Sequence, residues 1–198
     1  NESPGDLLSP QLLGAFVLLG LFPWLARALL GRVQALRVYR GWKKPARFDA
    51  NIAVIGAGSA GLVTAYIAAA VKAKAILIER DRMGGDCLNT GCVPSKTLIR
   101  SARVRHMQKQ APDFGVAGVP GEVDFPAVMA RVQSVISKIE PHDSVERYTG
   151  LGVDCRQGHA RLVSPWEIEI TNDQGVERVR ARHIVIASGG EPLVPPIP

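Results

Sequence analysis

Cysteine and histidine are scarce in this chain, which contains three cysteines and four histidines among 198 residues. A zinc site needs four ligands at short spacings. Cys155 stands far from Cys87 and Cys92 in the sequence, and no two histidines have ligand spacing. A secreted disulfide scaffold uses an even number of cysteines. The composition therefore disfavours both classes and fits a reducing compartment. We expect no metal site and take the histidines as structural or surface residues.

Charge is absent from one part of the chain and acidic charge from the next. Leu7–Ala26 is uncharged over 20 residues, about the length that a helix needs to cross a bilayer core. From Arg27 to Arg47 there are seven Lys or Arg and no acid. A signal peptide carries its basic residues before the apolar run, so this order disfavours one. The position of the basic run favours anionic lipid, and we expect no nucleic-acid partner.

Three interpretations of the amino-terminal stretch are open. They are a membrane-embedded helix, an interfacial amphipathic helix over Leu25–Val38, and a helix packed on protein. We favour the first, and the positive-inside rule then places the carboxyl side of this helix in the cytoplasm. Pro10, Gly14, Gly20 and Pro23 weaken a straight spanning helix, and an early end at Pro23 is a further alternative. We expect residues 1–47 to form a hydrophobic helix with a basic linker, and residues 48–198 to form a separate domain.

A glycine-rich turn lies between an expected strand, Asn51–Ile55, and an expected helix, Leu62–Ala73. The turn reads GAGSAG, and a second strand, Ala75–Ile78, ends at Glu79. This order is the fingerprint of a dinucleotide-binding fold. A glycine-rich turn without a ligand is the alternative. The candidate cofactor-binding residues in this part are Gly56, Gly58, Ser59, Ala60, Gly61, Glu79 and Arg80.

Each position in the fingerprint has its own physical role. Gly56 allows a tight turn, Gly58 lets backbone N–H groups approach a pyrophosphate, and Gly61 lets helix and strand pack closely. Glu79 can accept a hydrogen bond from a ribose 2′-hydroxyl and would repel a 2′-phosphate, which argues against NADP at this site. The fingerprint alone does not separate FAD from NAD.

The stretch Gly84–Lys96 reads GGDCLNTGCVPSK, with four residues between Cys87 and Cys92. A disulfide would close a ring that adds less than the roughly 3 kcal/mol of a 15-residue loop, so it suits opening and closing better than stapling. The Cα atoms must come closer than in a regular helix, so we expect Gly91 to interrupt the helix. A structural disulfide, a zinc site and two inert thiols are the alternatives.

A new helix is expected from Ser95, with Pro94 in its first turn. Cys92 would then lie beside the positive end of a helix dipole. That position predicts that its pKa is lowered and its thiolate favoured.

The segment CLNTGCVPSK resembles the active-site segment of class I pyridine nucleotide–disulfide oxidoreductases. These flavoproteins include lipoamide dehydrogenase, glutathione reductase and mercuric reductase. The resemblance covers about Phe48–Pro198, and Asp86 and Thr90 look closest to the mercuric-reductase-like branch. A later segment, HIVIASGGEP, is similar to the family's third flavin segment, with Ser188 in place of its threonine.

The resemblance implies that the first fingerprint holds FAD. NAD(P)H would reduce FAD, FAD would reduce a Cys87–Cys92 disulfide, and the dithiol would reduce a disulfide or metal-ion substrate. Cys87 would be the interchange thiol and Cys92 the charge-transfer thiol. Lys96 would lie near the flavin, although a solvated helix lysine is the alternative. The further implied contacts with the cofactor are Gly85, Asp86, Cys87, Cys92, Lys96, Ser188 and Gly189.

The resemblance also implies a longer protein. A nicotinamide-binding domain and a dimerisation domain are missing from the sequence, so we expect an FAD-binding fragment that is inactive alone and a homodimer when full length. We expect it to be membrane-associated, with the FAD domain in the cytoplasm. A non-catalytic, membrane-tethered flavin-binding module is the alternative function.

The expected fold is α/β, a Rossmann-like FAD-binding domain with a mostly parallel sheet, helices on both faces and a small antiparallel meander. Asp124 is expected to cap a helix that continues to about Tyr148, with a possible kink at Pro141. The later expected strands are Gly150–Cys155, Ala160–Val163, Trp166–Ile170, Val176–Arg182 and His183–Ala187.

Overall fold

The computed structural model describes residues 10–118, 121–191 and 193–197. Parts of three sequence predictions lie outside these residues: the start of the apolar run before Pro10, the end of a loop rich in glycine and proline that the sequence predicts over Pro112–Pro120, and Pro192 of the third flavin segment. The chain divides into two compact units, Asn1–Lys44 and Pro45–Pro198.

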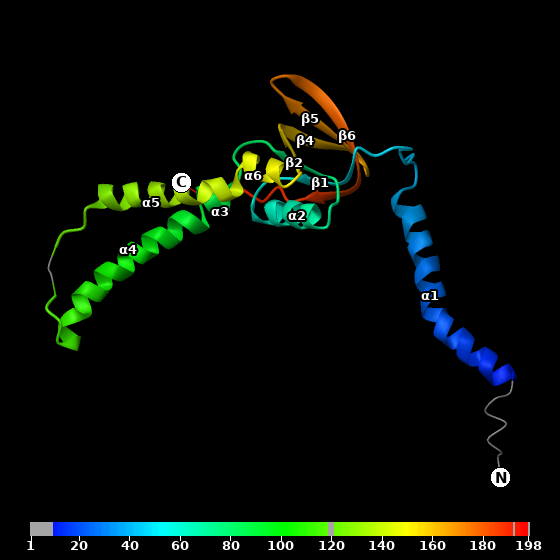
Figure 1. Cartoon of the computed structure of the whole chain (residues 1–198), viewed down its shortest axis with the longest axis horizontal. Helices are drawn as coiled ribbons and strands as arrows, with labels where there is room; N and C mark the ends of the chain where they lie inside the picture. Colours follow the sequence, from blue (N-terminus) through cyan, green and yellow to red (C-terminus); the bar gives the residue numbers. More distant parts are fainter. Residues whose placement is uncertain (1–9, 119–120, 192, 198) are drawn as a thin grey trace, which may run out of the picture. The chain divides into compact units, whose positions relative to one another are not determined.

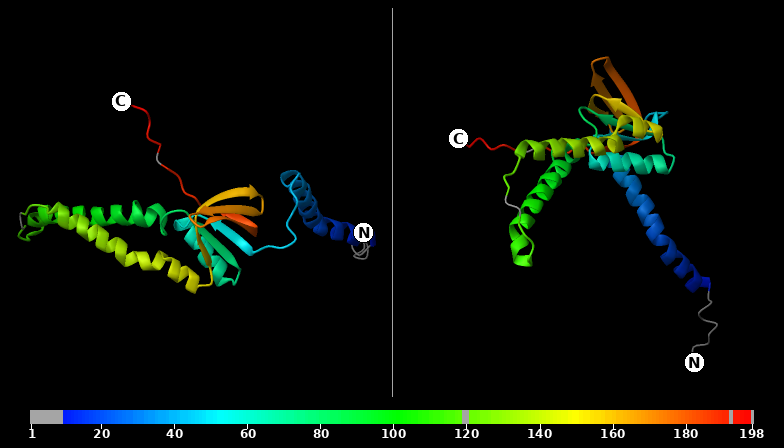
Figure 2. Two further views of the ribbon diagram at one scale, coloured as in Figure 1. Left: turned by 90° about the horizontal axis from the view of Figure 1, so that it is seen from above. Right: turned by 60° about the vertical axis from the view of Figure 1, so that its left-hand side comes forward.

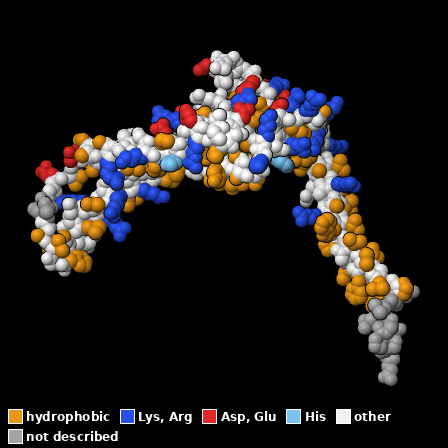
Figure 3. Space-filling view, in the orientation of Figure 1, with side chains coloured by type: hydrophobic (Ala, Val, Ile, Leu, Met, Phe, Trp, Pro, Cys, Tyr) orange, Lys and Arg blue, Asp and Glu red, His pale blue; other side chains and the backbone are white. Residues whose placement is uncertain are grey.

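The first unit contains one long helix, α1 (Pro10–Val38). It continues through Pro23, which rules out the alternative of an early end at this proline. The neighbouring Leu and Ala residues favour helix enough to tolerate one missing backbone hydrogen bond. Leu12–Val38 is long and apolar enough to cross a membrane, by length and composition. Apolar side chains cover this helix and are exposed (Figure 3).

The second unit is built on one six-stranded sheet with the order β3-β2-β1-β6-β5-β4 (Figure 1). Its first four strands are parallel, and β4, β5 and the first half of β6 form the antiparallel meander. The mostly parallel sheet and the meander are thus confirmed. The strands are β1 (Ala50–Ile55), β2 (Ala75–Glu79), β3 (Asp154–Gln157), β4 (His159–Ser164), β5 (Glu167–Asn172) and β6 (Gly175–Ile186).

The strand β6 joins the two parts of the sheet. The sequence predicted two strands here, Val176–Arg182 and His183–Ala187, but the structure has a single strand of 12 residues. Its first half pairs antiparallel with β5, and from Ala181 onward it pairs parallel with β1. No glycine or proline interrupts the strand after Gly175, so nothing forces a break. The sheet curls along this strand, and β4 comes into contact with β2.

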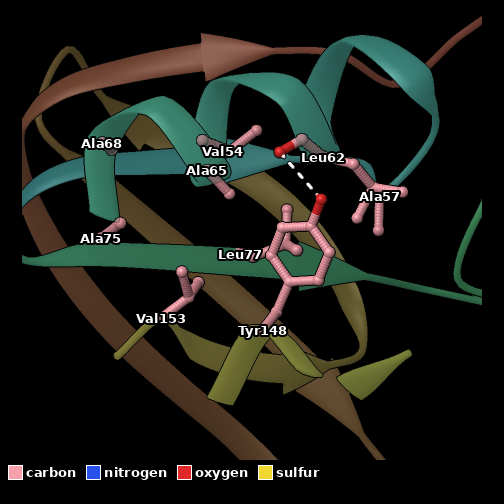
Figure 4. Packing of buried hydrophobic residues seen from close by; sticks show 9 residues of the cluster. All are labelled: Val54, Ala57, Leu62, Ala65, Ala68, Ala75, Leu77, Tyr148 and Val153. Atoms are coloured by element: carbon pink, nitrogen blue, oxygen red, sulfur yellow. Dashed lines mark hydrogen bonds between the residues drawn. The ribbon is translucent and has the colours of Figure 1, made fainter. Parts of the chain in front are cut away.

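The two faces of the parallel strands are covered differently. On one face, α2 (Ser59–Ala70) and Tyr148 pack on Val54 and Leu77 (Figure 4). On the other, Ile76 and Ile78 of β2 pack against Ile168 and Ile170 of β5. The cluster on this second face consists entirely of strand residues. The expectation of helices on both faces is therefore wrong for the described residues, because the curled meander takes the place of a second helical layer.

In the sequence, the remaining helices follow β2 and precede β3. They are α3 (Gly85–Asn89), α4 (Cys92–Gln110), α5 (Phe125–Ile139) and α6 (Val145–Gly150), with 3-10 turns η2 (Ala111–Phe114) and η3 (Glu140–Asp143). The helices α4 and α5 lie side by side as a long hairpin (Figure 2).

The helix expected from Asp124 to Tyr148 is divided in three. Asp124 caps α5, as predicted, and accepts a hydrogen bond from the Ala127 N–H at 3.0 Å. Pro141 then lies in η3. Ser144 caps α6 by accepting a hydrogen bond from the Arg147 N–H at 3.2 Å. The strand expected from Gly150 begins only at Asp154, because α6 and a turn at Gly152 with φ +87° precede it.

Tyr148 ties α6 to α2. Its buried hydroxyl donates a hydrogen bond of 3.2 Å to the Leu62 carbonyl, and burial raises the pKa of the phenol. We predict that Tyr148→Phe lowers the free energy of unfolding of the second unit by about 1 kcal/mol, the usual net value of one hydrogen bond. Denaturant titration followed by circular dichroism measures this. Tyr66→Phe, at an exposed tyrosine on α2, is the control and should change stability much less; equal effects would contradict the assignment.

Candidate functional site

A groove of about 990 Å³ lies at the carboxyl ends of β1, β2 and β6. In a parallel sheet this edge is where ligands bind, because the loops there belong to neighbouring strands and face the same space. The residues that line the groove are Gly56, Gly58, Glu79, Arg80, Asp81, Arg82, Gly85, Asp86, Asn89, Thr90, His159, Ala160, Ala187, Ser188, Gly189, Gly190 and Glu191.

Two of the three fingerprint glycines are required by the protein itself. Gly56 has φ +101°, and a Cβ there would lie 2.3 Å from the Ala187 oxygen. A Cβ on Gly61 would lie 1.8 Å from the Gly56 oxygen. Neither position has room for a side chain. Gly56 makes the tight turn, and Gly61 lets the start of α2 pack on that turn, as the sequence predicted.

Gly58 is different, because the space in front of it is open. A Cβ there would meet only the Gly85 Cα, at 3.9 Å. Gly58 is the residue before the first turn of α2, and no side chain caps the N–H groups of that turn. The absence of a side chain at Gly58 therefore leaves an open approach to the backbone at the helix start, as an anionic group requires.

Glu79 supports the glycine turn from the end of β2. One carboxylate oxygen accepts the Ala57 N–H at 2.6 Å, and the other accepts the Asp81 N–H at 2.9 Å. An ionised carboxylate has about four acceptor sites, so both oxygens retain capacity toward a ligand in the groove. Arg80 follows and forms an exposed ion pair of 3.2 Å with Glu191.

A second loop closes against the glycine turn. The Gly84 N–H donates to the Ala57 carbonyl at 2.9 Å, and a Cβ on Gly85 would lie 2.7 Å from the Gly58 Cα. Gly85 and Asp86 line the groove, and Cys87 follows directly in α3. The groove wall and the first cysteine therefore belong to one short segment.

The structure brings together some predicted site residues and not others. Those at the groove wall are Gly56, Gly58, Glu79, Arg80, Gly85, Asp86, Ser188 and Gly189. Those outside its lining are Ser59, Ala60, Gly61, Cys87, Cys92 and Lys96. Ser59, Ala60 and Gly61 form the first turn of α2. The two cysteines and Lys96 make a neighbouring centre at the start of α3 and α4.

Sequence reasoning missed the contribution of the turn between β3 and β4. His159 and Ala160 line the groove. His159 is exposed, in agreement with the expectation that the histidines are structural or surface residues, but its place at the groove was not predicted. Gly158 precedes them with φ +150°, and a Cβ there would lie 2.8 Å from both Ile170 and Thr171. Its N–H donates to the Glu79 carbonyl at 2.9 Å. The available signal was this glycine in the short connection between two expected strands, Gly150–Cys155 and Ala160–Val163.

The cysteines lie on two helices separated by a break. The helix α3 ends at Asn89, and α4 begins at Cys92, earlier than the expected start at Ser95, with Pro94 in its first turn. A Cβ on Gly91 would lie 2.9 Å from the Asp86 oxygen. The predicted interruption at Gly91 is thus confirmed. Cys87 is half-buried, Cys92 is exposed, and both are free thiols.

The acidities of the two thiols differ in an unexpected order. A hydrogen bond with Cys92 and another with Ser59 lower the pKa of Cys87, and the Lys96 ammonium lowers it further, while Asp143 opposes the shift. The hydrogen bond with Cys87 raises the pKa of Cys92. The expectation that the helix dipole makes Cys92 the more acidic thiol is wrong for this dithiol.

These features agree with the comparisons with known proteins. Residues 50–198 match the family described as pyridine nucleotide-disulphide oxidoreductase. The chain belongs to this family. It is 35% identical over 155 residues to a mercuric reductase of Shigella flexneri, covering 75% of this chain and 27% of that protein. It is 39% identical over 140 residues to a dihydrolipoyl dehydrogenase of Chlamydia pneumoniae, covering 70% of this chain and 30% of that protein.

A solved structure shares the fold. The Cu(II) complex of the HOCl-induced flavoprotein disulfide reductase RclA from Escherichia coli superposes with a TM-score of 0.60 at 25% identity. The match covers 75% of this chain and 30% of that one. The chain therefore spans about a third or less of the length of these relatives. It is a Rossmann-like FAD domain of the oxidoreductase family, as its sequence predicted.

The order of the thiol acidities gives a prediction. In a Cys155→Ser background, the reaction of Cys87 with iodoacetamide should follow a pKa below the usual value of about 8.5. Cys92→Ala should raise that pKa because it removes the first hydrogen bond, and Ser59→Ala should raise it less. Peptide mass spectrometry after timed labelling at several pH values measures the rate at Cys87.

Lys109→Gln, at the far end of α4, is the matched control for Lys96→Gln. Of these two lysine variants, only Lys96→Gln should raise the pKa of Cys87. The Lys96 ammonium lowers the pKa of both thiols in the unmodified chain, and the substitution removes this charge. A pKa of Cys87 that is unchanged in Cys92→Ala would contradict the assignment.

Proposed function

We propose that this chain is the FAD-binding part of a flavoprotein disulfide reductase. Electrons would pass from NAD(P)H through FAD to Cys87 and Cys92, and then to a disulfide or metal-ion substrate. The observation that carries the proposal is the segment Gly84–Cys87, which closes the glycine turn, lines the groove and continues into the first thiol. A cofactor in the groove and the dithiol would therefore be neighbours.

The residues of the groove fit a dinucleotide. The open backbone at Gly58 and the uncapped start of α2 suit a pyrophosphate. Glu79 keeps acceptor capacity for ribose hydroxyls, and Gly189 and Gly190 after β6 contribute backbone without side chains to the third wall. FAD held there would supply the two electrons that reduce a Cys87–Cys92 disulfide.

The two thiols would then divide the exchange with a disulfide substrate. Cys87, the more acidic thiol, attacks one substrate sulfur as its thiolate. A mixed disulfide forms, and the first substrate thiolate leaves and takes up a proton. Cys92 then loses its proton and attacks the Cys87 sulfur, which releases the second substrate thiol and forms the Cys87–Cys92 disulfide. The dithiol loses the two electrons that the substrate gains.

Two substrate classes are supported by similarity. Relatives of the chain are named mercuric reductase and dihydrolipoyl dehydrogenase. Asp86 and Thr90, which flank Cys87 and line the groove, resemble the mercuric-reductase-like branch, so a metal ion bound by the thiolates is a candidate beside a small disulfide. Like the implied homodimer, this assignment concerns the full-length protein.

We further propose that α1 holds the protein on a membrane and that the FAD unit lies in the cytoplasm. Support comes from the length and apolar composition of α1 and from the basic residues that come after its apolar part.

The cofactor site predicts distinct effects of glycine substitutions. Gly58→Val in the full-length protein should fold normally, because a Cβ at Gly58 meets no protein atom closer than 3.9 Å. It should lose most of its bound FAD, because the side chain fills the approach to α2. Flavin absorbance per protein and the thermal midpoint measure both effects. Gly121→Val, at a position with open space, should retain FAD. Stoichiometric FAD in Gly58→Val would refute the site.

Single cysteine variants of the full-length protein test the roles of the two thiols. Cys87→Ser should keep a long-wavelength absorbance from a thiolate beside oxidised flavin, since Cys92 then loses the partner that raises its pKa and keeps Lys96. Cys92→Ser should lose this band, and both variants should fail to reduce a disulfide substrate because exchange needs two thiols in turn. If the band survives only in Cys92→Ser, the roles are reversed.

A further inference from the structure

A second hollow lies at the opposite edge of the parallel sheet from the groove. It measures about 360 Å³ and is formed where β1 begins, beside the turn before β2. We call it the basic hollow. The residues that line it are Ala46, Arg47, Phe48, Asp49, Ala50, Asn51, Lys74 and Arg182.

Three basic side chains line the basic hollow without an acidic partner. Arg47, Lys74 and Arg182 form no ion pair among the residues that the structure describes. Arg182 lies over the Phe48 ring, 5.6 Å from its centroid. The arginines of the adjoining meander behave differently. Arg161, Arg178 and Arg180 pair with Glu167 or Glu169, and basic and acidic side chains are interspersed over these strands (Figure 3).

The acids near the basic hollow are already engaged. Asp49 accepts the Arg180 N–H at 2.7 Å. Asp154, whose pKa Lys74 lowers in a minor way, binds Arg156 through both carboxylate oxygens at 2.9 and 2.8 Å. Lys72 adds a further exposed cation in the same turn as Lys74. The basic hollow therefore holds three cations against one carboxylate, that of Asp49, and so presents net positive charge around a concave surface.

Its position in the chain indicates an occupant. The basic hollow includes Ala46–Asp49, the segment through which the chain enters the domain. Only residues 39–45 separate its first lining residue, Ala46, from the end of α1, and a chain of that length spans at most about 25 Å. If α1 lies in a bilayer, the basic hollow cannot be far from the surface of that bilayer.

We propose that the basic hollow binds the phosphate headgroups of anionic lipids, on the side of the membrane where α1 ends. The proposal rests on the proposed membrane role of α1. Basic residues near an anionic leaflet strengthen binding by roughly fivefold each. Headgroups in the basic hollow would turn the amino edge of the sheet toward the membrane. The cofactor groove, at the carboxyl edge, would face away from it and remain open to substrate.

The test uses the whole chain with vesicles of phosphatidylcholine, alone or with a minority of phosphatidylglycerol. The measured quantity is the ratio of the two partition coefficients. The variant Arg47→Gln/Lys74→Gln/Arg182→Gln should lower this ratio by roughly fivefold per side chain removed. The matched variant Arg100→Gln/Arg103→Gln/Lys109→Gln removes three exposed cations from α4 and should leave the ratio unchanged. Equal ratios for the two variants overturn the proposal.

A second, local measurement uses the unmodified chain and so does not depend on whether the triple variant folds. In the unmodified chain, acetylation of Lys74 should slow on anionic vesicles relative to neutral ones, while acetylation of Lys109 should not. Equal rates at Lys74 overturn the proposal. Protection of Lys74 by free inorganic phosphate to the same degree, or by a single-stranded oligonucleotide that displaces the chain from vesicles, would also overturn it in favour of those ligands.

The outcome separates this proposal from the others. Failure of the chain to bind neutral vesicles would refute the membrane role of α1, whereas FAD content, measured on the same samples, tests the groove. The partition coefficients of the two triple variants on anionic vesicles can still be compared with each other, and this comparison decides the role of the basic hollow.

Discussion

The candidate site depends on close backbone packing of three loops with no side chains between them. Gly56 lies against Ala187 after β6, Gly61 lies against Gly56, and Gly85 lies against Gly58, each without room for a Cβ. These contacts fix the ends of β1 and β6 and the start of α3 around one groove. They also explain why the glycine turn and the dithiol, separated by a whole strand in the sequence, form adjacent parts of one site. A single added methyl group at Gly61 would collide with backbone, which cannot move without displacing the turn.

The parts of the structure that the sequence predicted well are those determined by local chemistry. The glycine turn, Glu79 at the end of β2, the cap at Asp124 and the break at Gly91 each follow from one residue type at one backbone position. The parts that it predicted poorly depend on contacts distant in the sequence. Nothing local in Ile168 and Ile170 reveals that they cover the second face of β1 and β2, and the alternating pattern of β6 does not show that the strand changes partner at Ala181. The contribution of His159 to the groove was missed for the same reason.

The acidities of the two thiols depend first on the hydrogen bond between them. This bond is the leading cause of the pKa shift at both cysteines, and it lowers the pKa of Cys87 while it raises that of Cys92. The Lys96 ammonium lowers the pKa of both thiols, so it does not set their order. Ser59 then adds a hydrogen bond to Cys87 alone. Because Ser59 belongs to the first turn of α2, the same turn that opens the groove to a cofactor also makes Cys87 the more acidic thiol.

The charged residues of the domain are distributed unevenly between the two edges of its parallel sheet. Residues 48–198 contain 17 Lys or Arg against 16 Asp or Glu, so the net charge of the domain is close to zero and the chain's positive excess lies mostly before it. The unpaired cations in the basic hollow therefore reflect where the charged residues lie, and not an excess of basic residues in the domain. The groove at the opposite edge is lined by four acids against two arginines: Glu79, Asp81, Asp86 and Glu191 against Arg80 and Arg82. An anionic surface would attract the edge with the basic hollow and repel the edge with the groove. The two effects act in the same sense, so a nearly neutral domain can be oriented on a membrane by the separation of its charges.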